Sequence, residues 1–291
     1  MQTETVLGVL DAGEGYLRER GVAAPRLSIE WMLARVLGIT RLQVYMAHDR
    51  PVSETEKQSL REMVARRGTG EPLAYVLGDQ EFCGLQLRVT NAVLIPRPET
   101  EGLVELVRAA VAENALGVDI GTGSGAIAIA LCSLRPDLRM IATDVSQDAL
   151  AVARQNAEKI GVADRIDFAL GDYWQALDGR GPVDFVVSNP PYVDPGRPDL
   201  LGEGVAEFEP ALALFTPPDD PAASYRALVR DLEGRLRPGG QVFFETGVAV
   251  DQVALETMRA VPDLVDVELQ FDDAKLPRYL LARYAGSQTD S

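Results

Sequence analysis

Four consecutive residues, Asn189, Pro190, Pro191 and Tyr192, have the groups needed to hold a planar NH2 group. The Asn189 carboxamide offers one acceptor and two donors. Because proline has no backbone N–H, the Pro190 carbonyl can face a site without a competing donor beside it. Tyr192 adds a flat face. The set predicts a pocket that holds an amide, or the amino group of a base, in plane and aims it at an electrophile. The alternative is an ordinary turn at the end of a strand.

A glycine-rich loop upstream could hold the carrier of that electrophile. Residues 118–125 read VDIGTGSG, and they follow an apolar run and precede a run that favours a helix. Glycines there allow a tight turn and let the backbone approach a ligand closely. The spacing of Gly121, Gly123 and Ala126 also satisfies the loose dinucleotide fingerprint, so the loop alone does not choose between cofactors. The residues expected to contact the cofactor are Gly121, Thr122, Gly123, Ser124 and Gly125.

Two carboxylates lie near the loop, and one of them favours S-adenosylmethionine over a nicotinamide dinucleotide. Asp144 lies 18 residues after Ala126, at the end of the next apolar run, where an acidic side chain can bind the ribose hydroxyls of either cofactor. Its alternative role is to cap the helix that begins near Ser146. Asp119 lies two residues before the loop. Its negative charge suits the aminoacyl and sulfonium end of S-adenosylmethionine and would oppose a pyrophosphate. We therefore expect S-adenosylmethionine as cofactor and S-adenosylhomocysteine as its product.

A third apolar run, at residues 166–170, is followed by Gly171, Asp172, Tyr173 and Trp174. The adenine of the cofactor would lie at this point in such a fold. Asp172 could accept a hydrogen bond from the adenine amino group, and Tyr173 could pack on the ring. The alternative is a surface loop with an aromatic anchor.

The elements that must position these residues alternate between strands and helices. Strands are expected at residues 116–120, 138–143, 166–170, 183–188 and 241–246, with helices between them and two more extended runs at 264–271 and 278–284. This alternation predicts an α/β, Rossmann-like domain whose sheet is mainly parallel and covered on both faces. Ligands bind such a sheet at the carboxyl ends of its strands, which the motifs above follow.

The first 78 residues show helical spacing instead and predict a small all-α domain, with Ser53 and Glu56 at capping-box spacing. A hairpin is expected after this domain. Residues 85–89 alternate in polarity, Asn91 can turn the chain, and residues 93–95 resume an extended run.

Composition argues against several other chemistries. The chain has 291 residues, a net charge of −16, one histidine and two cysteines, so we expect no metal site, no Ser-His-Asp triad and no disulfide framework. Residues 91–291 carry 17 Lys or Arg against 32 Asp or Glu, a surplus of negative charge that disfavours phosphate backbones. No apolar run is long enough to cross a bilayer, and no export signal is present. We expect a cytoplasmic protein that contacts neither nucleic acid nor membrane directly.

Four further segments extend a resemblance over almost the whole chain. They read GEPLAY at residues 70–75, EFCG at 81–84, LIPRPETE at 94–101 and FEP at 208–210. Together with the motifs above, they closely resemble the HemK family of peptide chain release factor N(5)-glutamine methyltransferases. The resemblance implies methylation of the glutamine amide in the Gly-Gly-Gln tripeptide of class 1 translation release factors. It also implies four parts of the chain: a helical substrate-docking domain at 1–78, a hairpin linker at 79–98, a class I S-adenosylmethionine-dependent methyltransferase domain at 99–285 and a flexible tail at 286–291.

The resemblance assigns roles to the motif residues. It implies that residues 121–125 form the cofactor loop, that Asp144 binds ribose and that Tyr173 lies at the adenine. It further implies that Asn189 touches both cofactor and substrate, while residues 190–192 complete the glutamine pocket.

Some positions leave alternatives open. Family members often have Trp where Tyr173 stands, so either Tyr173 or Trp174 could contact adenine. Residues 272–278, DDAKLPR, depart from the family pattern Asp-x-x-Gly/Asn-x-x-Arg. Arg97 and Glu99 could bind a ligand or lock the linker.

The expected mechanism depends on alignment. An amide nitrogen is a poor nucleophile because its lone pair is delocalised into the carbonyl. We expect the Asn189 oxygen and the Pro190 carbonyl, as the catalytic groups, to accept both amide N–H bonds and turn the lone pair toward the methyl group. The expected partner is a class 1 release factor, bound by a monomer. Rival substrates are a glutamine of a ribosomal protein and an adenine amino group in nucleic acid, and a non-catalytic binding module is a third alternative.

Overall fold

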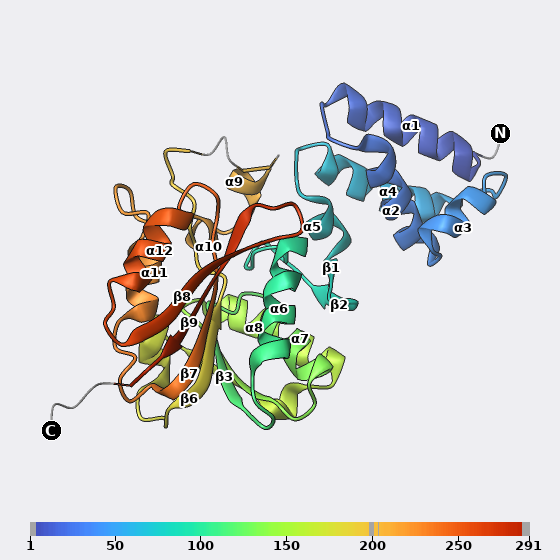
Figure 1. Ribbon diagram of the computed structural model, residues 1–291. Helices are drawn as coiled ribbons and strands as arrows, with labels where there is room; N and C mark the ends of the chain where they lie inside the picture. The colour runs from blue at the N-terminus through green and yellow to red at the C-terminus, as the bar shows by residue number, and fades with distance from the viewer. Residues whose placement is uncertain (1–3, 198–200, 203, 287–291) are drawn as a thin grey trace, which may run out of the picture. The chain divides into compact units, whose positions relative to one another are not determined.

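The computed structural model describes residues 4–197, 201–202 and 204–286, and the chain divides into two compact units. The helical unit comprises the chain up to Asp79 together with Leu201–Phe208, and the sheet unit comprises the rest from Gln80 onward. Figure 1 labels their helices and strands. Within the described residues, no helix is both long and apolar enough to cross a bilayer.

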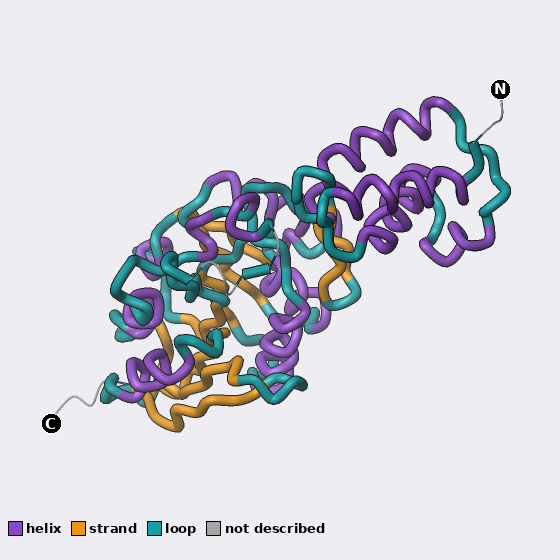
Figure 2. The backbone as a smooth tube through the Cα atoms, turned by 90° about the horizontal axis from the view of Figure 1, so that it is seen from above, coloured by secondary structure: helices purple, strands orange, loops and turns teal. Residues whose placement is uncertain are grey.

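The helical unit consists of helices, all but the last of which contribute buried side chains to one core. Its helices are α1 Val6–Glu19, α2 Pro25–Leu37, α3 Arg41–Met46, α4 Glu54–Arg67, α5 Leu73–Leu77 and α9 Val205–Phe208. Figure 2 shows them as purple coils along the chain. The fully buried side chains of α1 and α2 fill the centre of this core: Val6, Leu10, Leu17, Ile29, Met32 and Leu33. The predicted capping box forms at the start of α4, where Glu56 Oε2 accepts from Ser53 N at 2.8 Å and Ser53 Oγ accepts from Glu56 N.

The sheet unit contains a seven-stranded sheet in the order β5-β4-β3-β6-β7-β9-β8. Its strands are β3 Leu116–Ile120, β4 Arg139–Asp144, β5 Ile166–Leu170, β6 Val183–Ser188, β7 Leu236–Glu245, β8 Leu264–Phe271 and β9 Pro277–Tyr284. The first five strands in that order pair in parallel, whereas β9 runs antiparallel to both of its neighbours. The predicted mainly parallel α/β sheet is confirmed.

Helices cover both faces of this sheet. α6 Pro98–Ala110, α7 Ala126–Leu134 and α8 Gln147–Ile160 pack on one face, and α11 Ala223–Val229 and α12 Asp251–Arg259 pack on the other. Shorter elements connect them: the 3-10 helices η1 Ala163–Arg165 and η2 Tyr173–Leu177, and α10 Ala211–Leu214.

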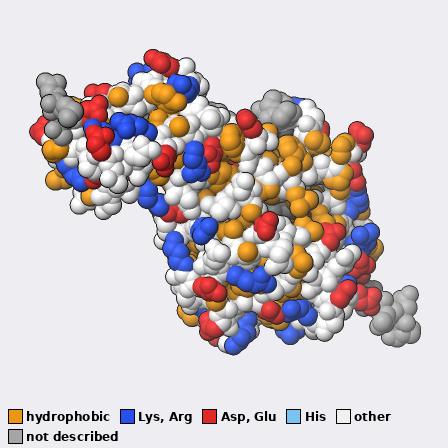
Figure 3. All heavy atoms as spheres, turned by 180° about the vertical axis from the view of Figure 1, so that it is seen from behind, with side chains coloured by type: hydrophobic (Ala, Val, Ile, Leu, Met, Phe, Trp, Pro, Cys, Tyr) orange, Lys and Arg blue, Asp and Glu red, His pale blue; other side chains and the backbone are white. Residues whose placement is uncertain are grey.

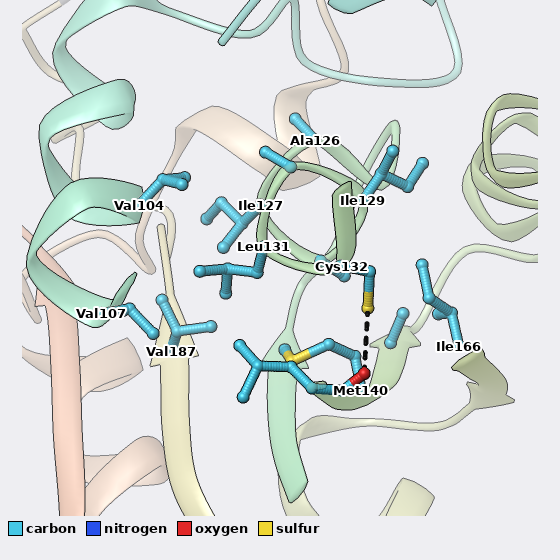
Figure 4. Close-up of a cluster of buried hydrophobic side chains, with 14 of the residues drawn as sticks. Val104, Val107, Ala126, Ile127, Ile129, Leu131, Cys132, Met140, Ile166 and Val187 are labelled. Carbon is cyan, nitrogen blue, oxygen red and sulfur yellow. Dashed lines mark hydrogen bonds between the residues drawn. The ribbon is translucent and has the colours of Figure 1, made fainter. Parts of the chain in front are cut away.

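Neighbouring residues of a strand enter different cores because side chains alternate across a sheet. In β6, Val187 joins the core beneath α6 and α7, while Val186 joins the core beneath α11 and α12. Figure 4 shows the first of these cores, where Val104 of α6 and both Ile127 and Leu131 of α7 lie near Val187. On the outer surface, Figure 3 shows hydrophobic side chains gathered on one face of the sheet unit.

The hairpin lies earlier in the chain than the sequence predicted. Its strands are β1 Asp79–Phe82 and β2 Leu85–Arg88, and the chain turns at Cys83 and Gly84, which both have positive φ. Residues 93–95 form no strand. The predicted second arm was wrong because alternation of polarity marks a strand without specifying the neighbour that pairs with it.

Candidate active site

A cavity of about 560 Å³ lies in the sheet unit, where β3, β4, β5 and β6 reach their carboxyl ends. Four sequence features meet in its wall: the glycine loop, the acidic end of β4, the segment after β5 and the segment after β6. Their lining residues are Gly121, Gly123, Asp144, Asp172, Tyr173, Asn189, Pro190 and Pro191. Five other residues predicted for the site do not line it: Asp119, Thr122, Ser124, Gly125 and Tyr192. The cavity therefore lies at the carboxyl ends of the strands, where parallel α/β sheets bind their ligands.

The glycine loop has a backbone that glycine adopts readily. The φ angle is 75° at Gly121, 55° at Gly123 and 83° at Gly125, all in the left-handed region. The backbone N–H groups of Gly121 and Thr122 donate to the Thr143 carbonyl at 2.9 and 2.8 Å, which ties the loop to β4. The loop is therefore fixed at its start and exposes backbone to the cavity at Gly121 and Gly123.

Asp119 is a buried carboxylate with one unsatisfied oxygen. Its Oδ2 accepts from Thr122 Oγ1 at 2.6 Å and from Ala128 N at 3.3 Å, whereas no described residue donates to Oδ1. Burial raises the pKa of Asp119 to about 7, although both hydrogen bonds act to lower it. A cationic group nearby would favour the ionised form. The residue thus holds the loop through Oδ2, and its charge suits a cationic ligand.

Asp144 ends β4 and holds two backbone segments. Its Oδ2 accepts from Gly123 N at 2.9 Å, and its Oδ1 accepts from Ser146 N at 2.9 Å. The cap of α8 is Ser146 itself, whose Oγ accepts from Ala149 N at 3.2 Å. Burial raises the pKa of the Asp144 carboxyl. Because each carboxylate oxygen can accept more than one hydrogen bond, Asp144 can also bind a ligand hydroxyl at the cavity wall.

The two aromatic residues that follow Asp172 lie in different environments. Trp174 is buried in the core, and its Nε1 donates to the Leu228 carbonyl at 2.8 Å. Tyr173 begins η2 with a φ angle of 44° and lines the cavity together with the exposed Asp172. Burial raises the pKa of Tyr173. The structure therefore places Tyr173 at the cavity and Trp174 in the core.

Asn189 follows β6 and is held through its amide nitrogen. Its Nδ2 donates to Thr100 Oγ1 at 3.2 Å, and within the described part of the chain nothing donates to its Oδ1. The Pro191 carbonyl accepts from Ser224 Oγ at 3.0 Å, whereas the Pro190 carbonyl has no donor among the described residues. Two oxygen acceptors, Asn189 Oδ1 and the Pro190 carbonyl, therefore remain for a ligand.

Tyr192 packs next to this segment. Its hydroxyl lies 3.4 Å from Glu245 Oε1, and a Cβ atom at Gly247 would lie 2.9 Å from its ring, so glycine makes room for the aromatic side chain. Burial raises the pKa of Tyr192. Because Tyr192 does not line the cavity, its predicted contact with the substrate stays a prediction.

Residues 92–94, 210–213 and 215–217, to which the sequence assigned no contact with a ligand, also line the cavity. The buried Glu209 side chain joins them, since its Oε2 accepts from Ile95 N at 3.0 Å and its Oε1 forms an ion pair with Arg97. Glu209 belongs to the FEP segment, and Ile95 and Arg97 belong to the LIPRPETE segment. Nothing in the sequence indicated that these two segments contact each other.

This pairing bears on the open roles of Arg97 and Glu99. Arg97 holds its own segment to Glu209. The Glu99 side chain is exposed, and its backbone carbonyl accepts from Tyr279 Oη at 2.7 Å. Neither residue lines the cavity, and Arg97 ties its segment to Glu209, whereas Glu99 contacts Tyr279 through its backbone carbonyl, so the role of its side chain stays open.

A glycine loop after β3 and a carboxylate at the end of β4, on a sheet of this order, are typical of class I S-adenosylmethionine-dependent methyltransferases, and the sheet unit has this fold. Comparison with known proteins narrows the class. A family model described as the PrmC N-terminal domain matches residues 9–78, and one described as the methyltransferase small domain matches residues 99–202.

Curated relatives match nearly end to end. The release factor glutamine methyltransferase of Nitratidesulfovibrio vulgaris is 39% identical over 282 residues, which cover 96% of this chain and 95% of that protein. That of Geobacter sulfurreducens is 39% identical over 251 residues, 86% of this chain and 87% of the relative. This chain belongs to the release factor glutamine methyltransferase family. A solved ribosomal protein L11 methylase from Lactobacillus delbrueckii subsp. bulgaricus shares the fold, with a TM-score of 0.50 and 20% identity, covering 69% of this chain and 86% of that one.

Proposed function

We propose that this protein transfers a methyl group from S-adenosylmethionine to the side-chain amide nitrogen of the glutamine in the Gly-Gly-Gln motif of a class 1 translation release factor. The observation that carries the proposal is a pair of acceptors, Asn189 Oδ1 and the Pro190 carbonyl, in the wall of the cavity that the glycine loop also lines. The names of the relatives that match almost the whole chain support the substrate.

The residues present fit S-adenosylmethionine, which supplies an electrophilic methyl group on a positively charged sulfur. The loop at residues 121–125 would approach its amino-acid part through the backbone, and the Asp119 carboxylate would balance its positive charge. Asp144 would accept from the ribose hydroxyls. Asp172 would accept from the adenine amino group, and Tyr173 would pack on the ring.

Asn189 and Pro190 would act on the glutamine by alignment. Their two oxygens would each accept one N–H of the substrate amide, which favours an amine-like nitrogen with its lone pair directed at the methyl group. Alignment of this kind contributes about 7–11 kcal/mol in favourable systems. The surplus proton can leave to water after transfer, so no dedicated base is required.

The helical unit is proposed to dock the release factor, and the expected working form is a cytoplasmic monomer. Large apolar side chains on α3 support docking, since Leu42 is 72% and Met46 82% exposed. Clustered apolar side chains at a surface mark contacts for a protein partner. The proposed limits remain 1–78 for docking, 79–98 for the linker and 99–285 for catalysis.

Incubation with S-adenosylmethionine and a purified release factor, followed by peptide mass spectrometry, tests the proposal. One added methyl group is expected on the glutamine of the Gly-Gly-Gln motif. No methylation is expected when that glutamine is replaced by glutamate. Parallel reactions with ribosomal proteins and with adenine-containing nucleic acid test the rival substrates, and methylation of either one with the release factor unmodified would overturn the proposal.

A further inference from the structure

Behind the cavity wall, three side chains from different elements form one line of hydrogen bonds. Asn189 Nδ2 lies 3.2 Å from Thr100 Oγ1, and Thr100 Oγ1 lies 2.6 Å from Glu245 Oε2. Thr100 is in the first turn of α6, Glu245 is the last residue of β7, and both are buried. Of the three, Asn189 alone lines the cavity.

The chemistry of the three groups fixes the direction of each hydrogen bond. An ionised carboxylate can only accept, so the Thr100 hydroxyl must donate to Glu245. The Thr100 oxygen then has only lone pairs left, and the Asn189 carboxamide must present its NH2 group to it. This orientation follows from the donors and acceptors alone. Asn189 Oδ1 is thereby left as a free acceptor.

We propose that Thr100 and Glu245 are positioning residues that keep the Asn189 carboxamide oxygen available to the substrate N–H. The proposal rests on the proposed function, in which Asn189 Oδ1 accepts from the glutamine amide. If Glu245 donated instead, the Thr100 hydroxyl would be free to donate to Asn189 Oδ1. The Asn189 NH2 group would then face the substrate NH2 group. Two donors cannot form a hydrogen bond, so the substrate amide would lose this acceptor.

The surroundings of Glu245 govern how readily this reversal occurs. Burial raises the pKa of Glu245 to about 7, while the Thr100 hydrogen bond and the positive charge of Arg278 act to lower it. The titratable groups that face Glu245 are Tyr192, Glu99 of α6, Tyr225 of α11, and Arg278 and Tyr279 of β9. Protonation of Glu245 therefore falls within the range of ordinary assays.

Turnover should depend on this protonation. As the pH falls through about 7, the protonated fraction of Glu245 rises, so kcat at saturating cofactor and release factor should fall. In Glu245→Gln, the new carboxamide can donate to Thr100 at every pH. We expect this variant to lose roughly 10²-fold in kcat, the cost of a small misplacement of an aligned group. Its remaining activity should lack the decline below neutral pH, and its affinity for S-adenosylhomocysteine should equal that of the wild type.

A second pair of variants isolates the hydroxyl. Thr100→Val keeps the shape of the side chain without its hydroxyl and should lose kcat as Glu245→Gln does. Thr100→Ser keeps the hydroxyl and should retain most of the turnover. Tyr225→Phe is the matched control, since the Tyr225 hydroxyl donates to the backbone carbonyl of Glu245 at 3.1 Å and not to its carboxylate. It should change thermal stability and leave kcat unaltered.

The outcomes separate this proposal from the proposed function. Wild-type turnover in Thr100→Val, or equal losses in Thr100→Val and Thr100→Ser, would overturn the positioning role while release factor methylation by the wild type still stood. If a thermal unfolding assay shows that Glu245→Gln does not fold, the comparison of Thr100→Val with Thr100→Ser tests the positioning role alone. If the wild-type protein transferred no methyl group to the release factor, the proposed function itself would fall.

Discussion

Asn189 Oδ1 and the Pro190 carbonyl are the two acceptors proposed to bind the substrate amide. Both lack donors among the described residues, and both belong to a segment that lines the cavity. Proline has no backbone N–H that could compete beside the carbonyl. The direction of the Asn189 oxygen is set by Thr100 through the Asn189 amide nitrogen. The proposed contribution of these two residues to catalysis is therefore the direction in which their oxygen lone pairs point.

Replacing Asn189 with alanine removes one of these acceptors. We expect kcat to fall by roughly 10²–10³-fold, the usual cost of losing one preorganised polar contact in an active site. Transfer of a radiolabelled methyl group to the release factor measures this loss. The thermal unfolding temperature and the affinity for S-adenosylhomocysteine serve as controls, and a near-wild-type rate in a folded variant would refute the assigned role.

We expect cofactor affinity to depend on pH through Asp119. Burial raises its pKa to about 7, so its protonated fraction grows as the pH falls below that value, and a protonated carboxyl no longer attracts a cation. The dissociation constant of S-adenosylhomocysteine should therefore increase from about pH 8 to about pH 6, a range that spans this pKa. Titration calorimetry measures the change. Asp119→Asn should bind more weakly near pH 8 and show no such dependence, and a pH-independent wild-type affinity would contradict the account.

Among the elements, Glu209 ties together the two segments that the sequence left without a role. Its buried carboxylate accepts from Ile95 N and pairs with Arg97, and the segments on either side of this tie line the cavity. A buried acceptor that serves two donors is costly to remove, because at least one donor is left without a partner.

Glu209→Ala should lower the free energy of unfolding by about 1–3 kcal/mol, the usual penalty for a buried unsatisfied polar group. Urea unfolding of the whole chain measures this change. The matched control is Glu105→Ala, which breaks an exposed ion pair with Arg108 on α6 and should cost less than about 1 kcal/mol. Equal effects of the two substitutions would show that Glu209 is not the tie described here.

Elements were predicted well where their pattern is local. Four strands have the limits expected from the sequence, at 116–120, 166–170, 183–188 and 264–271. Each is marked by a short apolar or alternating run, whether it lies inside the sheet, as β3 and β6 do, or at an edge, as β5 and β8 do. The hairpin arms were misplaced because pairing depends on a partner that the pattern does not name.

The least predictable contacts join distant parts of the chain. Thr100 and Glu245 are 145 residues apart and meet because α6 packs beside β7. Neither residue stands out by type. Similarly, Tyr173 and Trp174 looked equivalent in the sequence, and the turn into η2 separated them, with one at the cavity and the other in the core.

At the level of the whole molecule, the two units present different features to a substrate. The sheet unit holds the cavity and its acceptors, and the helical unit presents exposed apolar side chains on α3. If the helical unit docks the release factor, the affinity for the whole protein substrate and the chemistry on its glutamine are separable properties.

Leu42→Ser tests this separation. Burying a leucine side chain in an interface contributes about 1.5–3 kcal/mol, so the variant should show a KM for the release factor higher by roughly ten-fold or more, with kcat unchanged. Methylation of a short Gly-Gly-Gln peptide should be unaffected. Leu134→Ser, which alters an exposed leucine on α7 of the sheet unit, is the control and should leave both values as in the wild type. Identical effects of the two substitutions would contradict a docking role.

The most direct test of the central claim is a crystal structure of this protein with S-adenosylhomocysteine and a glutamine-containing release factor peptide. We expect the glutamine amide nitrogen to lie within hydrogen-bond distance of both Asn189 Oδ1 and the Pro190 carbonyl, with its free side toward the cofactor sulfur. A glutamine nitrogen bonded to neither oxygen, or a sulfur atom outside the cavity beside the glycine loop, would contradict it.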